Sequence, residues 1–323
     1  RRVSTTSGQA VAAGRVRAPR PSAAERLTRA ASKLTLPVIL LLPAMTIIVG
    51  LVGYPLVKTI WLSFTDTRLG DLINGTSTWV GLENYKEVFT DEQLRTSLIN
   101  TVVFGSACVI GTMALGMAVA LLLNQRLRFN WFFSLAVLLP WAVPALAASS
   151  IFKWLFDSRY GFVNWALVNL GFDRFQDYAW FADRNSAYVA MFVVVVWQSF
   201  PFIALSLLAG LQTVPRDTLD AAAVDGANAV QRFRLVTLPL LRPILAVLVI
   251  FSTIWDFKIF DQVYVLAQGV PDRAADTAAV TGYREAFALG HFGTGAAIAV
   301  VLFCVLLAFS IAYVRLIGKE ART

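Results

Sequence analysis

Three ionisable residues stand within an otherwise apolar stretch of this 323-residue sequence: Asp256, Lys258 and Asp261, between Pro243 and Ala267. A charged side chain inside a membrane costs free energy unless it meets water, a substrate or a partner, so such residues mark transport pathways. On a helix that turns about 100° per residue, Lys258 and Asp261 lie about 60° apart, which predicts a structural ion pair between them. Asp256 then has no intrahelical counter-ion, and its carboxylate is predicted to face a translocation path.

Polar and aromatic side chains accompany this carboxylate at helical spacing. Ser252 lies one turn before Asp256, and Trp255 adds an aromatic surface beside it. The preceding apolar stretch carries Gln198 and Phe202, a polar and aromatic pair four residues apart. We predict that these five residues line a substrate path. Two alternatives remain open: a hydrogen bond from the carboxylate to another helix, and a proton or ion relay through the three charged residues.

The sequence shows neither a catalytic constellation nor a cofactor-binding loop. No phosphate-binding loop of the form Gly-x-x-x-x-Gly-Lys-Ser/Thr occurs, since Gly318, Lys319 and Glu320 lack both the preceding glycine and the hydroxyl. His291 is the one histidine, so a metal site built on imidazoles is excluded. We therefore predict that the chain is not an enzyme and binds neither a cofactor nor a metal itself.

The composition places these residues in a membrane. Apolar residues make up 57% of the sequence and charged residues 15%. About 25% charged is usual in soluble domains, and roughly 20 apolar residues suffice to cross a bilayer as a helix. Five stretches of at least 24 residues carry no charge, and the stretch around Asp256 is a sixth span by its apolar content. We predict an all-helical protein whose residues 34–316 form six spans, at about 35–57, 97–123, 131–154, 187–211, 243–267 and 291–315.

The distribution of Lys and Arg predicts the orientation of these spans. An even number of spans puts both termini on one side, and 17 of the 28 Lys and Arg residues lie on that side against nine on the other. Positive residues gather on the cytoplasmic side, so both termini are predicted to be cytoplasmic. Because this bias accounts for the net charge of +8, no basic face remains for nucleic acid.

Short tails are predicted at both ends. Residues 1–33 form a basic cytoplasmic tail in which Ala23, Leu27 and Ala30 have the spacing of a short amphipathic helix on the inner leaflet. A plain tail is the alternative. Residues 317–323 form the second cytoplasmic tail.

Residues 212–241 read as a docking element between two spans. Pro215 suits the start of a first short helix, and Gly226 permits a left-handed turn after it. Asn228 can cap a second helix, which would end before Pro239. A short exposed helix in such a loop is shaped to dock into a groove on a partner protein.

This loop resembles the EAA loop of bacterial ABC importer permeases, with Asp220 in place of the usual glutamate. Further similarity to the carbohydrate-importer branch, including the actinobacterial trehalose-importer permeases, occurs in residues 79–85, at Asn100 and Thr101, and in residues 259–293. The resemblance covers residues 35–316. It assigns contact with an ATPase to seven residues of the loop: Asp220, Ala221, Ala222, Asp225, Gly226, Arg232 and Phe233.

The resemblance implies a type I importer half in the bacterial inner membrane. Such a permease pairs with a second, homologous permease, and both dock onto an ATPase dimer that binds ATP and Mg²⁺. An extracytoplasmic sugar-binding protein or lipoprotein delivers the substrate, here expected to be a disaccharide such as trehalose. An ion- or proton-coupled secondary transporter using Asp256, Lys258 and Asp261 remains the alternative, and a scaffold without a substrate is disfavoured by the polar residues at mid-depth.

Overall fold

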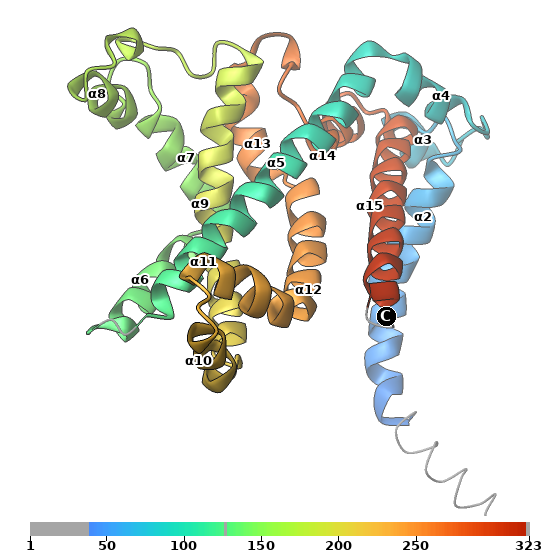
Figure 1. Ribbon diagram of the computed structural model, residues 1–323. Coiled ribbons are helices and arrows are strands. Elements are labelled where there is room, and N and C mark those ends of the chain that lie inside the picture. The colour runs from blue at the N-terminus through green and yellow to red at the C-terminus, as the bar shows by residue number, and fades with distance from the viewer. Residues whose placement is uncertain (1–38, 126–127, 321–323) are drawn as a thin grey trace, which may run out of the picture. The chain divides into compact units, whose positions relative to one another are not determined.

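A computed structural model describes residues 39–125 and 128–320 (Figure 1), so the predicted tail helix lies outside the described residues. The chain divides into two units, residues 1–57 and 58–323. In the first unit the described residues are helical and none is buried. They form most of the apolar helix Ile39–Leu62, which contains a π-helical segment, Val49–Gly53, and ends in α2 (Tyr54–Leu62). A helix with so little buried surface needs lipid or another protein around it.

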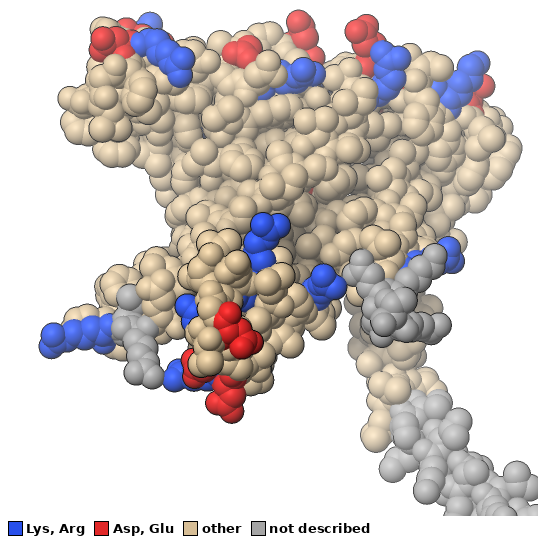
Figure 2. Space-filling view, in the orientation of Figure 1, with Lys and Arg blue, Asp and Glu red and all other residues tan. Residues whose placement is uncertain are grey.

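The second unit contains the remaining helices long and apolar enough to cross a membrane. These are α5 (Glu92–Leu123), α9 (Arg184–Leu211), the run Ala229–Gly269 that contains α12 (Leu238–Phe257), and α15 (Phe292–Glu320). Within this unit Figure 2 shows charged side chains at two ends of the view, separated by a broad uncharged band. That pattern suits a bilayer, whose core excludes charge. Helix α15 continues through Glu320, so the first residues of the predicted tail 317–323 are helical, while the apolar span itself ends at Ile317.

Shorter helices connect the spans. Figure 1 places α10 and α11 at the same end of this unit as the junction of α5 and α6, and α4, α8 and α14 at the other end. The connecting elements are α3 (Leu69–Asn74), α4 (Glu83–Thr90), α8 (Phe162–Asn169), α10 (Arg216–Val224), α11 (Ala229–Arg232), α13 (Asp261–Leu266) and α14 (Ala278–Tyr283). Two π-helical segments, Phe233–Thr237 and Arg284–Ala288, follow α11 and α14.

The third predicted span, 131–154, is not one straight helix. It consists of α6 (Asn130–Ala142) and α7 (Ala145–Leu155), which meet at an angle of 93°. Pro144 lacks an amide hydrogen and disfavours helical geometry at the residue before it, and Val143 is extended with ψ of 129°. The predicted span is therefore a broken helix with its bend at Val143 and Pro144.

The fifth predicted span, 243–267, is broken as well. Helix α12 ends at Phe257, and α13 begins only at Asp261. Lys258 and Phe260 have φ/ψ values of −98°/13° and −116°/−59°, outside regular α-helical geometry. The break falls beside the three charged residues, so angles calculated for one continuous helix do not hold there.

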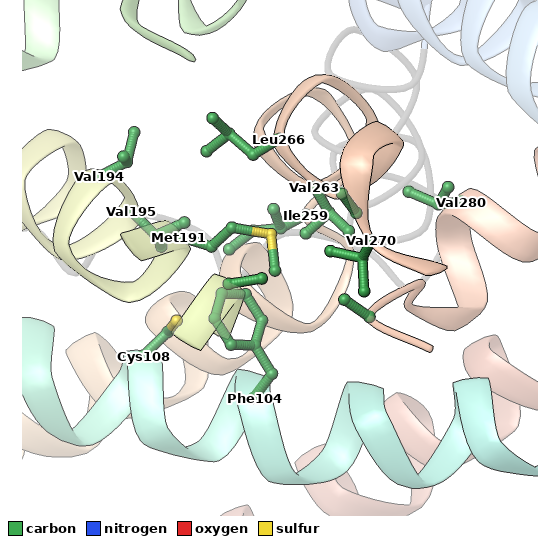
Figure 3. Close-up of a cluster of buried hydrophobic side chains, with 13 residues drawn as sticks. Phe104, Cys108, Met191, Val194, Val195, Ile259, Val263, Leu266, Val270 and Val280 are labelled. Carbon is green, nitrogen blue, oxygen red and sulfur yellow. The ribbon is translucent and has the colours of Figure 1, made fainter. Parts of the chain in front are cut away.

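The core of the unit forms where α5 crosses α9. At Gly116 of α5 a Cβ atom would lie 2.6 Å from Ile203, so only glycine allows this close crossing. A hydrophobic cluster joins α5, α9 and α13, and Figure 3 shows its side chains pointing toward one another. It includes Phe104, Cys108, Met191 and Val263. The cluster fixes α13 against the two long helices, and with it the break that precedes α13.

A pair of polar residues in α5 fastens the loop that follows α13. The amide nitrogen of Asn100 donates to the carbonyl oxygens of Ala274 (2.9 Å) and Asp276 (3.0 Å), and the Thr101 hydroxyl accepts from the Ala278 amide (2.7 Å). Burial raises the pKa of the Asp276 carboxyl, and the Arg284 guanidinium 3.1 Å away opposes that rise. The loop is therefore held in place by buried hydrogen bonds.

Candidate functional site

A cavity of about 300 Å³ lies among α5, α9, α12 and the two helix breaks. Its size is at the lower end of the range typical of small-molecule sites. Apolar and polar side chains share its wall. The lining residues are Thr112, Trp141, Ala145, Gln198, Ser199, Phe202, Ile203, Phe251, Ser252, Trp255, Asp256, Lys258, Ile259, Phe260, Asp261 and Gln262.

All five residues predicted for the substrate path line this cavity. Asp256 is 2% exposed, and the Ser252 hydroxyl donates to its Oδ2 over 2.8 Å. In the sequence Ser252 lies one turn before Asp256, but the prediction considered only charged residues as partners on the same helix. It therefore did not include this hydrogen bond. The other carboxylate oxygen, Oδ1, has no hydrogen-bond partner among the described residues. A buried acceptor of this kind is costly unless a ligand, water or another chain supplies a donor.

The predicted ion pair between Lys258 and Asp261 is wrong for this conformation. The ion pairs found among the described residues do not include it, because the helix that would set the two residues one turn apart ends at Phe257. The Lys258 ammonium instead lies 5.3 Å from the centre of the Trp255 ring, a cation–π contact. Both charged residues line the cavity together with Asp256.

Three aromatic rings form a continuous surface along the cavity. Phe202 and Phe251 lie 5.0 Å apart between ring centres, and Phe251 stacks on Trp255 at 5.8 Å. Sequence reasoning missed Phe251, although its position four residues before Trp255 was a usable signal. It also missed Thr112, a buried hydroxyl of α5 that lines the cavity and has no partner among the described residues.

The cavity wall therefore combines an aromatic surface with hydroxyl, amide and carboxylate groups. Such a wall suits a ligand with an apolar ring face and several hydroxyl groups. Within the described residues no group of three or more His, Cys, Asp or Glu is placed to hold a metal ion.

The first short helix predicted for the 212–241 loop forms as α10. The second, α11, does not end before Pro239 as predicted, because it continues through the π-helical segment Phe233–Thr237 into α12. After α10, Gly226 adopts φ of +84°, and the Gly226 and Ala227 amides donate to the Ala223 and Ala222 carbonyls over 3.1 and 3.0 Å. These two bonds form a Schellman motif, which requires a left-handed residue at Gly226. Asn228 caps α11 through a reciprocal capping box with Gln231.

The seven loop residues predicted to contact a partner fall on this structure. Four of them are exposed and three are partly buried. Asp220, Ala221, Asp225 and Gly226 are exposed, and Ala222, Arg232 and Phe233 are partly buried. The loop thus presents a polar helix end to the surroundings of the chain.

Comparison with known proteins supplies the family. Residues 111–320 match the family described as binding-protein-dependent transport system inner membrane component. The diacetylchitobiose uptake permease DasB of Streptomyces coelicolor is 39% identical over 88% of this chain and 87% of its own length. The trehalose/maltose permease MalF of Thermococcus litoralis is 34% identical over 88% and 94%. The sulfoquinovosyl glycerol permease SmoG of Agrobacterium fabrum is 36% identical over 88% and 91%.

A solved structure shares the fold. A chain of a bacterial ABC transporter involved in alginate import superposes with a TM-score of 0.77 over 91% of this chain and 99% of that chain, at 19% identity. The all-helical permease fold predicted from the spans and from the 212–241 loop is therefore confirmed. The family match covers the cavity as well as the loop, and the chain belongs to the binding-protein-dependent transport system inner membrane components.

Proposed function

We propose that this chain is a permease subunit of an ATP-driven importer of small sugars and that the cavity is its part of the translocation path. The aromatic surface of Phe202, Phe251 and Trp255 in the same cavity as the buried Asp256 carboxylate carries this proposal. Aromatic faces pack against the apolar faces of sugar rings, and carboxylate oxygens accept hydrogen bonds from sugar hydroxyls. The substrate path would be lined by Phe202, Ser252, Trp255 and Asp256, with Gln198 at its edge.

The proposed substrate is a compound of two linked units, such as a disaccharide. The relatives named above transport diacetylchitobiose, sulfoquinovosyl glycerol and trehalose or maltose, which share that size. A cavity of about 300 Å³ is compatible with a substrate of this kind. Trehalose is one candidate among these.

The proposed partners follow from surfaces that the chain leaves open. A second permease would complete the path, and lipid would cover the remaining apolar surface of the spans. The 212–241 loop would dock onto an ATPase dimer, which binds ATP and Mg²⁺, through Asp220 to Phe233. An extracytoplasmic binding protein or lipoprotein would deliver the sugar at the opposite face.

The energy source is tested with the complete complex in proteoliposomes. The permease pair, the ATPase and the binding protein encoded beside them are reconstituted, and the binding protein is first screened against diacetylchitobiose, trehalose and maltose. We expect uptake of the bound sugar to require ATP and the ATPase and to continue in the presence of a protonophore. Uptake that stops with the protonophore and proceeds without the ATPase would instead support ion coupling through Asp256, Lys258 and Asp261.

The proposed orientation places both termini and the 212–241 loop in the cytoplasm. Single cysteines at Asn74, Gln176 and Gln268, all exposed, are expected to react with an impermeant thiol reagent added to intact cells. A cysteine at Gln125, in the α5–α6 junction, is expected to react only after the cells are permeabilised. Cys304 is exposed and is replaced by alanine beforehand. The reverse labelling pattern would invert the orientation and separate the loop from any cytoplasmic ATPase.

A further inference from the structure

One side-chain amide connects the two helix breaks that border the cavity. At the break between α6 and α7, the extended backbone of Val143 leaves its carbonyl outside any regular helix. Gln198, in the middle of α9, donates from Nε2 to this carbonyl over 2.8 Å. In a membrane an unpaired backbone carbonyl costs several kcal/mol of free energy. The hydrogen bond from Gln198 pairs the Val143 carbonyl and avoids this cost at the break.

The same amide also holds the second break. Gln262 is the second residue of α13, which starts directly after the break that ends α12. Its Nε2 donates to Oε1 of Gln198 over 2.8 Å. The hydrogen bonds therefore form a chain with one direction, from Gln262 through Gln198 to Val143, and both ends of the Gln198 amide are engaged in it.

The helices around these hydrogen bonds are packed together on one side of the two helix breaks. Met191 and Val194 of α9 and Val263 of α13 share a buried cluster, and Phe152 of α7 packs against it. On the other side of the breaks, Trp141 of α6 and Trp255 of α12 line the cavity. Gln198 thus lies between this buried cluster and the cavity, whose wall it helps to form.

We propose that Gln198 is a positioning residue for transport, and that the chain from Gln262 through Gln198 to Val143 fixes the angle of both helix breaks and thereby the separation of the cavity walls. This inference rests on the proposed function of the cavity. It assigns Gln198 a role different from that of Asp256: Gln198 acts on the walls, whereas the carboxylate contacts the substrate.

Two variants test the two hydrogen bonds of Gln198 separately. Gln198→Met removes both hydrogen bonds, and Gln262→Met removes one while Gln198 keeps its bond to Val143. Ser199→Ala is the matched control, because Ser199 lines the same cavity next to Gln198 without a side-chain hydrogen bond to the described residues. Each variant is made in the complete complex, and its yield and composition are compared with the wild type.

The angle of the α6–α7 break is measured first, without sugar. Spin labels at Phe132→Cys and Trp154→Cys, both exposed and on opposite arms of the break, report their separation by pulsed electron resonance in a Cys304→Ala background. We expect one narrow distance population in the wild type and in Ser199→Ala, and a broadened or shifted population in Gln198→Met. An unchanged population in Gln198→Met would overturn the proposal, whatever sugar the complex transports.

Transport then distinguishes positioning from direct contact with the sugar. Loss of a buried hydrogen bond corresponds to roughly a fivefold to tenfold change in rate. We expect Gln198→Met to lower maximal uptake by about that factor without changing the concentration of loaded binding protein that gives half-maximal uptake. Gln262→Met should lower it in the same direction, and the double variant should resemble Gln198→Met because no further bond is left to lose. An additive double variant, or a changed half-maximal concentration, would overturn the proposal. A wild-type complex that takes up no sugar would refute the proposed function and leave the distance measurement standing as a separate test.

Discussion

Asp256→Ala is expected to leave the importer complex assembled and to lower sugar uptake by at least about tenfold, because a hydrogen bond to a charged group contributes roughly 1.5–3 kcal/mol. The carboxylate is 2% exposed, lines the cavity, and keeps Oδ1 without a partner among the described residues. A sugar hydroxyl is the donor that we propose for this oxygen. Uptake by proteoliposomes and the subunit composition of the purified complex are measured side by side.

Two neighbouring variants serve as controls for the carboxylate. Asp256→Asn keeps the shape and the oxygen that accepts from Ser252, but it removes the charge and replaces Oδ1 with an NH2 donor, to which a sugar hydroxyl would have to accept. Its defect should be smaller than that of Asp256→Ala, because the volume and a hydrogen-bonding group are kept. Ser252→Ala releases Oδ2 and should be milder still. Normal uptake by Asp256→Ala, or a defect explained wholly by a complex that does not assemble, would contradict the assignment of Asp256 to the substrate path.

The position of Asp256 could be predicted because its signal is local. A carboxylate in an apolar stretch needs an explanation in any helix geometry, and Ser252 one turn earlier shares its face whether or not the helix continues beyond it. The predicted Lys258–Asp261 ion pair, in contrast, depended on the course of the helix beyond Asp256. That prediction assumed an unbroken helix across residues 258–261, whereas the helix ends at Phe257.

The breaks themselves lie beyond what hydropathy can reveal. A span bent by 93° at Val143 and Pro144 has the same apolar length as a straight one, so counting charge-free residues cannot distinguish them. Pro144 was a usable local signal, whereas the break after Phe257 contains neither proline nor glycine. The bonds of Gln198 to Val143 and Gln262 join residues far apart in the sequence. They depend on packing that one sequence does not show.

The turn and the helix cap of the 212–241 loop could be predicted because both depend on residues that are adjacent in the sequence. The left-handed turn at Gly226 and the cap at Asn228 both follow from backbone preferences of single residues. Several exposed residues of the loop are among those proposed to contact the ATPase. Substitution at the turn therefore tests the proposed coupling role.

Gly226→Val is expected to abolish most of the ATPase stimulation by loaded binding protein while the affinity of that binding protein for sugar stays unchanged. The φ of +84° costs a residue with a Cβ about 1–2 kcal/mol, and a β-branched side chain more, so the Schellman motif between α10 and α11 should be lost. A Cβ at this position would meet no atom within 4 Å, so backbone strain and not a clash is the cause. Gly226→Asn should retain most stimulation, because asparagine tolerates the left-handed region. Gly75→Val is the matched control: Gly75 also ends a helix, with φ of +70° and no atom within 4 Å of a Cβ, but it follows α3 at the other end of the unit. If Gly75→Val reduces stimulation as strongly as Gly226→Val, or if Gly226→Val behaves like the wild type, the 212–241 loop does not transmit ATP hydrolysis to the path.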